Sequence, residues 1–207
     1  MFYNILDKKR KDILPLLKSL KRDFYLAGGT ALALQIGHRD SIDFDFFCDV
    51  NIDTEELFER LKEIFAEHNV QKIQEEKNTL AIIVDNDIKI SFFTYRYPLL
   101  KPKIDEEYIE LASVEDIACM KLSAIVSRST QKDYIDLYFV LQNHKLSQLL
   151  EMTNDKFTNL DTNLIIKSLT YFDDMVEEPI MFKNDKSISF EQVKVFLSNC
   201  VRKYLNK

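Results

Sequence analysis

The sequence contains very little glycine. Only 3 of its 207 residues are glycine, whereas an average composition of about 7% would give roughly 14. All three lie in one stretch of the chain, as Gly28, Gly29 and Gly37. Because glycine has no Cβ, the Gly28-Gly29 pair predicts a place where the backbone takes a positive φ or approaches another group closely.

Cysteine is also scarce. Cys48, Cys119 and Cys200 are widely spaced, form no CxxC motif and have no histidine nearby, which argues against a disulfide framework and against a zinc site. Residues 1–11 are rich in charge without an apolar run behind them, and no apolar run in the chain reaches membrane-spanning length. We therefore expect no signal peptide, no membrane partner and a cytoplasmic location.

Positive charge is in the minority. The chain has 28 Lys and Arg against 34 Asp and Glu, for a net charge of −6, which argues against a protein that coats nucleic acid with its whole surface. A nucleic-acid partner would have to bind local basic patches, for which the candidates are Lys8, Lys9, Arg10, Lys11, Lys18, Lys21, Arg22, Lys101 and Lys103. Solvated lysines on helix faces are the simpler interpretation of each group.

The hydrophobic fraction of 46% is enough for a real core in one sizeable domain or two small ones. Apolar spacing predicts a helix over residues 5–20, in which Asp12 would cap a new segment ahead of Pro15, and another over residues 54–68. Strands are predicted over residues 70–74, 79–84 and 88–94, as an antiparallel meander with a turn at Asp85-Asn86. The irregular segment 95–103 separates this half from a helical half, which begins with a capping signal at Ser113 and ends with a capping box at Ser189.

The glycine pair lies between a short apolar strand, residues 25–27, and a helix over residues 30–36. A strand, two glycines and a helix point free backbone N–H groups and the positive end of the helix at one spot, which suits phosphate. Soon afterwards, Ser41 to Phe47 alternates with period two. Asp43 and Asp45 therefore share one strand face, with Ile42, Phe44 and Phe46 on the other. Adjacent carboxylates repel each other, so the pair predicts a site for Mg²⁺ or Mn²⁺.

Gly28-Gly29, followed after a helix by Arg39, Ser41 and Asp43-x-Asp45, resembles the DNA polymerase β-like nucleotidyltransferases. The fuller pattern GGTALAL…GHRDSIDFDFF resembles the AbiEii/AbiGii toxin branch of that superfamily. The resemblance implies an α+β fold, with a mixed and mostly antiparallel sheet, helices, and a helical C-terminal part. We accordingly expect residues 1–103 to form the nucleotidyltransferase core and residues 104–207 a helical domain.

The later stretch SVEDIACMKLSAIVSRSTQKDYIDLYFVL resembles further motifs of the same family. Lys121 is a single cation in an apolar turn, so we expect it to have an anionic partner. Asp133 and Asp136 are three residues apart on a helix and share one face. The resemblance favours Asp136 as a functional residue, while Asp133 either assists it or holds Lys132 or Arg128.

The resemblance implies a metal-dependent enzyme that moves a nucleoside monophosphate from an NTP to an acceptor hydroxyl. Asp43 and Asp45 would hold Mg²⁺ or Mn²⁺, and Lys121 would counter the phosphate charge. Asp136 would orient or deprotonate the acceptor, or complete the metal shell. The phosphate oxygens would be bound by Gly28, Gly29, Thr30, Arg39 and Ser41.

One position departs from this scheme, and another has no role in it. Polymerase β-like enzymes often have a third metal carboxylate on a later strand, where this chain offers Ser91, so the number of metal ions stays open. His38 is interpreted as a surface or capping residue without a catalytic role.

The acceptor is not specified by the residues themselves. The resemblance implies a toxin of a toxin–antitoxin or phage-defence system with a cognate antitoxin, and some relatives add nucleotides to the 3′ end of tRNA. A protein or a small molecule is an alternative acceptor, because fold does not fix function. A nucleotide-binding module without catalysis is the other alternative, and Ser91 is the feature that favours it.

Overall fold

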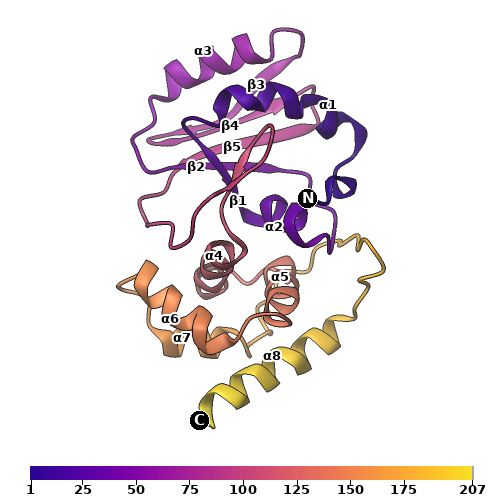
Figure 1. Cartoon of the computed structure of the whole chain (residues 1–207), viewed down its shortest axis with the longest axis vertical. Helices are drawn as coiled ribbons and strands as arrows, with labels where there is room; N and C mark the ends of the chain where they lie inside the picture. The colour runs from indigo at the N-terminus through magenta and orange to yellow at the C-terminus, as the bar shows by residue number, and fades with distance from the viewer. Residues whose placement is uncertain (207) are drawn as a thin grey trace.

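A seven-stranded mixed sheet dominates the N-terminal half of the protein, and helices form the C-terminal half (Figure 1). The structure is a computed structural model and describes residues 1–206. The strands run in the order β3-β4-β5-β2-β1-β7-β6 across the sheet. Their bounds are β1 (Tyr25–Ala27), β2 (Phe44–Cys48), β3 (Val70–Glu76), β4 (Thr79–Val84), β5 (Ile88–Thr94), β6 (Ile104–Asp105) and β7 (Glu110–Leu111).

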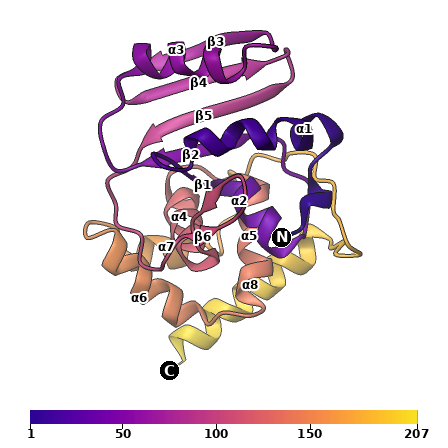
Figure 2. The ribbon, with the colours of Figure 1, turned by 45° about the horizontal axis from the view of Figure 1, so that its top comes forward.

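The helices surround this sheet and build the lower half of the molecule (Figures 1 and 2). They are the 3-10 turns η1 (Tyr3–Ile5) and η2 (Lys18–Leu20), and the α-helices α1 (Lys8–Leu17), α2 (Gly28–Ile36), α3 (Thr54–Ile64), α4 (Val114–Ser127), α5 (Gln131–Leu141), α6 (Leu146–Lys156), α7 (Thr162–Ser168) and α8 (Phe190–Leu205). Within residues 1–206, no helix is both long enough and apolar enough to span a bilayer. The expected α+β fold with a helical C-terminal part is confirmed.

The two faces of the sheet differ in chemistry. Phe44 and Phe46 of β2 are buried on one face, whereas Asp45 between them is on the other. The strand pairing shows which face α3 covers. Phe44 is paired with Ile90, Ile90 with Ile82 and Ile82 with Lys72, so these four side chains share one face. The Lys72 ammonium lies 4.7 Å from the centre of the Phe58 ring on α3. Helix α3 therefore covers the apolar face, and Asp45 is on the opposite one.

Most predicted elements of the sheet are confirmed. Strands β3, β4 and β5 form the expected antiparallel meander. Asp85 and Asn86 take positive φ values of 52° and 55°, as the tight hairpin turn between β4 and β5 requires.

Three details of the sequence prediction were wrong. Helix α1 is capped by Asp7, whose side chain accepts from the Arg10 N–H, and not by Asp12, which instead pairs with Lys8 one turn away. Pro15 consequently lies inside α1. Ile42 is 55% exposed, because β2 begins only at Phe44 and the loop before it does not follow the pleat. Strands β6 and β7 extend the sheet beyond residue 103. Each has only two residues, which is too few to show an alternation of apolar and polar side chains.

The segment between the two halves is anchored by a buried ion pair. Asp116 of α4 is 0% exposed and accepts from the backbone N–H groups of Leu100 and Lys101. The Lys156 ammonium on α6 lies 2.8 Å from Asp116 Oδ1 and also donates to the Pro98 carbonyl. These bonds fix the segment to two helices, and one continuous hydrophobic core includes residues of both halves.

We predict that Lys156→Met lowers the free energy of unfolding by about 3 kcal/mol or more, because it leaves the Asp116 carboxylate buried without its cation. Urea denaturation measures this change. Lys8→Met removes an exposed lysine of an i,i+4 pair and should change stability by less than about 1 kcal/mol. Equal effects of the two substitutions would show that the buried pair contributes no more than a surface pair.

Candidate active site

The start of α2 lies directly against the Asp45 carboxylate. Gly28 has a φ of +71°, and a Cβ built there would lie 3.1 Å from Asp45 Oδ2. A Cβ built on Gly29 would lie 2.6 Å from Arg39 Nη2. The predicted positive φ and close approach at the glycine pair are both confirmed, and they bring the first turn of α2 to the predicted metal ligand.

The loop that carries Asp43 is held by two helices, α1 and α2. The buried Thr30 hydroxyl of α2 hydrogen-bonds the Asp43 carbonyl and lies 2.7 Å from the Ser41 hydroxyl. Arg10 of α1, itself buried, donates from Nε to the Ile42 carbonyl at 2.7 Å. Thr30 therefore holds the loop through its side chain, and only its backbone N–H belongs to the predicted phosphate-binding turn.

The two carboxylates create a negative site that favours a cation. Burial, and secondarily the negative charge of Asp43, raises the pKa of Asp45, while three cations oppose the rise, namely Lys89, Lys121 and Arg128. Ser91 of β5 is paired with Asp45 in the ladder, at the position predicted from the resemblance. A hard divalent ion fits this set of oxygen donors, with water and phosphate oxygens as its further ligands.

Lys121 has the anionic partners that its apolar surroundings predicted. It is 7% exposed, and its ammonium lies 2.6 Å from Asp133 Oδ1 and 2.7 Å from Asp136 Oδ2. Helix α4 supplies the lysine and α5 supplies both carboxylates. Because the ammonium has three N–H groups, one of them is left for a further acceptor.

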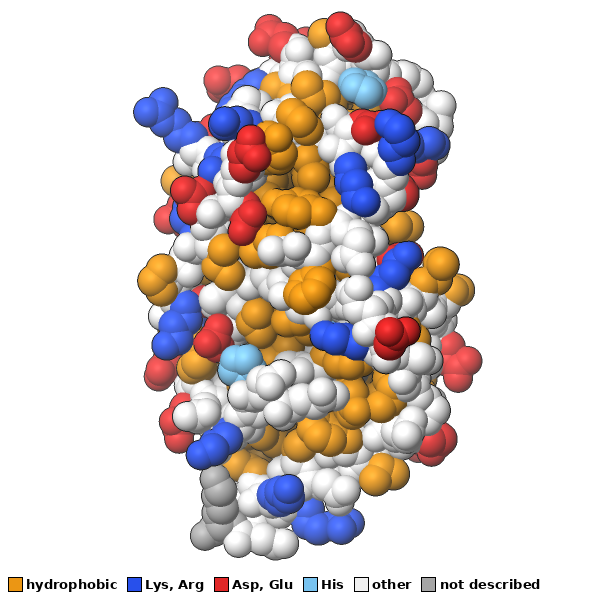
Figure 3. All heavy atoms as spheres, turned by 45° about the vertical axis from the view of Figure 1, so that its right-hand side comes forward, with side chains coloured by type: hydrophobic (Ala, Val, Ile, Leu, Met, Phe, Trp, Pro, Cys, Tyr) orange, Lys and Arg blue, Asp and Glu red, His pale blue; other side chains and the backbone are white. Residues whose placement is uncertain are grey.

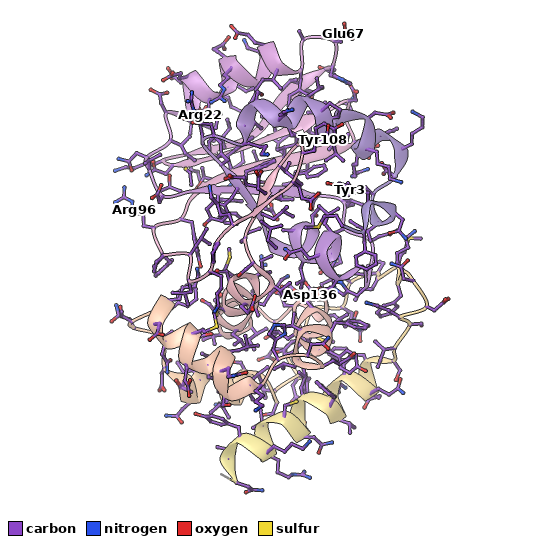
Figure 4. The ribbon with its side chains drawn as sticks, viewed as in Figure 1. Tyr3, Arg22, Glu67, Arg96, Tyr108 and Asp136 are labelled. Carbon is purple, nitrogen blue, oxygen red and sulfur yellow. The ribbon has the colours of Figure 1, made fainter. Side chains whose placement is uncertain are left out.

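Asp136 is the centre of a buried charge cluster (Figure 4). Arg39 forms a two-pronged contact with it, from Nε to Oδ1 at 2.7 Å and from Nη2 to Oδ2 at 2.9 Å. His38 Nε2 lies 2.7 Å from the same Oδ1. Burial alone would raise the pKa of Asp136, but Arg39 and Lys121 hold it well below its ordinary value.

These contacts disagree with the direct role predicted for Asp136. Both of its oxygens are shared among Arg39, His38 and Lys121, and a carboxylate with a depressed pKa is a weak base. Asp136 instead contacts Lys121 and Arg39, the two cations whose side chains it holds in place. The guanidinium of Arg39, predicted to bind phosphate, is likewise directed at Asp136 and is 3% exposed.

The prediction that His38 lies at the surface was wrong. It is 0% exposed, and its ring lies 5.1 Å from the Phe139 ring of α5. Gly37 ends α2 with a φ of +63°, and the chain then turns His38 inward to Asp136. Burial lowers the pKa of His38, although the bond to Asp136 opposes this.

Asp133 and Arg128 adjoin the same cluster. Asp133 is 1% exposed and accepts from Lys121 at 2.6 Å and from the Thr130 hydroxyl at 2.8 Å. Arg128 Nε lies 3.4 Å from Asp133 Oδ2, with 66% of the arginine side chain exposed. Lys132 pairs with Glu178 instead. Asp133 thus contacts Arg128, and Arg128 is the accessible cation of the cluster.

A segment near the C-terminus, residues 176–183, supports the site. It has no apolar periodicity from which its position could be predicted. Phe182 forms a bridge with Arg39, and the Met181 carbonyl accepts from the Asp40 N–H at 2.8 Å. Val176 of the same segment hydrogen-bonds Ser129 and Gln131 through its backbone. Residues 176–183 therefore join the loop before Asp43 to the connection between α4 and α5.

Comparison with known proteins identifies the family. Residues 16–199 match the model of the nucleotidyl transferase AbiEii toxin of type IV toxin–antitoxin systems. The chain belongs to this AbiEii family. It is also 39% identical over 208 residues to an uncharacterized protein of Aquifex aeolicus, with 97% of this chain and 98% of that protein covered.

Solved structures with a similar fold include one from Mycobacterium tuberculosis and one from Helicobacter pylori. MenT4, a nucleotidyltransferase toxin of Mycobacterium tuberculosis, has a TM-score of 0.65 at 14% identity, with 96% of this chain and 82% of that chain covered. JHP933 of Helicobacter pylori has a TM-score of 0.59 at 17% identity, with 96% and 91% covered. The resemblance to nucleotidyltransferase toxins is therefore confirmed for the family and the fold.

We predict that Asp136→Asn lowers the free energy of unfolding at pH 7 by about 3 kcal/mol or more, because it leaves Lys121 and Arg39 buried with less negative charge. Since the pKa of Asp136 is lowered in the folded state, this contribution is complete above the ordinary aspartate pKa of about 3.9 and is lost as the pH falls through the lower folded-state pKa. Denaturant titrations of both proteins between pH 7 and pH 2 measure the difference.

The exposed residue Asp12 provides a matched control, because Asp12→Asn removes one surface carboxylate and should cost less than about 1 kcal/mol. A loss for Asp136→Asn as small as that for Asp12→Asn would contradict a central role of the cluster.

Proposed function

We propose that this AbiEii-family nucleotidyltransferase transfers a nucleoside monophosphate from an NTP to an acceptor hydroxyl, in a reaction that depends on Mg²⁺ or Mn²⁺. The observation that carries the proposal is the approach of Asp45 to Gly28 at the start of α2. A metal ion on Asp43 and Asp45 and the amides of the first turn of α2 would then contact the same phosphate chain.

The residues of the site divide into ligands and supports. Asp43 and Asp45 bind the metal ion, which when bound neutralises charge on the transferring phosphate. The amides of Gly28, Gly29 and Thr30 and the Ser41 hydroxyl bind phosphate oxygens. Asp136 and Asp133 orient Lys121, whose remaining N–H donates to a phosphate oxygen.

Arg128 supplies the net positive charge of the cluster. The charges of Lys121 and Arg39 are balanced by those of Asp133 and Asp136, which leaves the largely exposed Arg128 guanidinium uncompensated. Its two-pronged donor geometry suits a phosphate group of the substrate.

The acceptor that we propose is the 3′ end of tRNA, on the strength of the toxin family. On the face seen in Figure 3, Lys and Arg are interspersed with Asp and Glu and do not gather into one broad patch, so an RNA bound there would have to be held through local contacts. As the toxin of a toxin–antitoxin system, the protein would act together with a cognate antitoxin.

The test is to incubate the purified protein with total tRNA, Mg²⁺ and each labelled NTP in turn. The wild type should label RNA, whereas Asp43→Ala and Asp45→Ala should lose about 10²-fold or more of the activity and remain folded. Asp49→Ala removes an exposed aspartate just after β2 and should retain full activity.

Label on RNA from the wild type and from Asp49→Ala alone would support the transfer and identify the base. Asp43→Ala or Asp45→Ala as active as the wild type would contradict the metal assignment. Binding of NTP that requires Asp43 without any labelled RNA would contradict the tRNA acceptor and direct the search to a protein or a small molecule.

A further inference from the structure

Lys89 lies on the sheet face that carries the predicted metal ligands. Asp45 and Ser91 are paired in the parallel ladder between β2 and β5, so their side chains are on one face of the sheet. Lys89 precedes Ser91 by two residues within β5 and therefore points to the same face. Lys89 is exposed, whereas Ser91 is 2% exposed.

The ammonium of Lys89 has no partner of its own within residues 1–206, where it takes part in no ion pair. Its position in β5, two residues before the partner of Asp45, places its charge on the face that carries Asp45. Lys121, by contrast, is neutralised by Asp133 and Asp136. Lys89 thus places one uncompensated positive charge beside the two carboxylates.

The two carboxylates of the site, Asp43 and Asp45, balance the charge of one divalent ion. Asp43 and Asp45 supply two negative charges, and the described residues contain no group of three or more acidic, histidine or cysteine side chains that could hold a metal ion. Ser91 adds a neutral hydroxyl at the position next to Asp45. A second divalent ion would lie beside the Lys89 ammonium without a carboxylate to balance it, which Coulomb repulsion opposes.

We propose that the site binds a single divalent metal ion, and that the Lys89 ammonium takes the place of a second one by donating to an oxygen of the transferring phosphate. The inference rests on the proposed function. It assigns Lys89, which the sequence patterns did not single out, to the catalytic site, and it gives Ser91 the role of excluding a second ion.

Counting Mn²⁺ ions tests this directly. Crystals of the full chain are grown with MnCl₂ and an α,β-methylene analogue of each of the four nucleoside triphosphates, and anomalous scattering locates the ions. We expect one Mn²⁺ on Asp43 and Asp45 in the wild type. The double variant Lys89→Met/Ser91→Asp removes the cation and adds a carboxylate, and it should hold two.

The variant Lys89→Met/Ser91→Asn is the matched control for this count. It has nearly the same side-chain volumes without the added negative charge, and it should hold one Mn²⁺. Two ions in the wild type, or one ion in the Lys89→Met/Ser91→Asp variant, would overturn the inference while the proposed function stands. No Mn²⁺ at Asp43 and Asp45 in any protein would overturn the proposed metal site itself.

Activity provides a second test. Lys89→Met should lower kcat by about 10²-fold, as expected for the loss of one donor to a developing charge, and Lys89→Arg should restore part of the activity. Lys77→Met, at the exposed turn between β3 and β4, controls for the loss of a surface lysine and should be as active as the wild type. Equal kcat values for Lys89→Met and Lys77→Met would overturn the role of Lys89.

Discussion

The ion pairs of the buried Asp136 carboxylate are the interactions on which the candidate active site depends. This carboxylate joins Lys121 of α4 to Arg39 and His38 of the loop after α2. Arg39 and Asp136 are 97 residues apart in the sequence. Removing such a carboxylate would leave two buried cations with too little negative charge, which is among the costliest changes a protein core can suffer. The loop before Asp43 and the helix that carries Lys121 are therefore held in one fixed relation.

Two further contacts reinforce this relation from either side. Asp116 and Lys156 bind the segment between the halves to α4 and α6, and residues 176–183 join the Arg39 loop to the start of α5. Both halves share one hydrophobic core. The proposed reaction thus takes place where the Asp45 face of the sheet adjoins α2, at a site whose support comes from distant parts of the chain.

Electrostatics at this site follow a simple balance. The carboxylates of α5 neutralise Lys121 and Arg39, whereas burial, and secondarily the negative charge of Asp43, raises the pKa of Asp45. One divalent ion, with Arg128 and Lys89 as the accessible cations, would then match the phosphate chain of a nucleotide. The site differs in this way from one with three carboxylates, because the neutral Ser91 occupies the place beside Asp45.

The sequence by itself determined the features that short-range physics encodes. The Gly28-Gly29 pair predicted the positive φ and the close approach, the alternation around Asp45 predicted its strand face, and the apolar turn around Lys121 predicted a buried anionic partner. Family motifs added the nucleotidyltransferase fold. The first three predictions each depend on residues that are close to one another in the sequence.

Only the tertiary structure decided what Asp136, His38 and Ser91 do. Asp136 and Arg39 meet because α5 packs beside the end of α2, and Ser91 lies next to Asp45 because β5 pairs with β2 in that register. Buried ion pairs between distant segments have no period in the sequence, since their geometry is set by packing. For that reason the sequence offered candidate residues for the site, while the structure showed which of them, such as Asp136 and Arg39, are held in buried ion pairs.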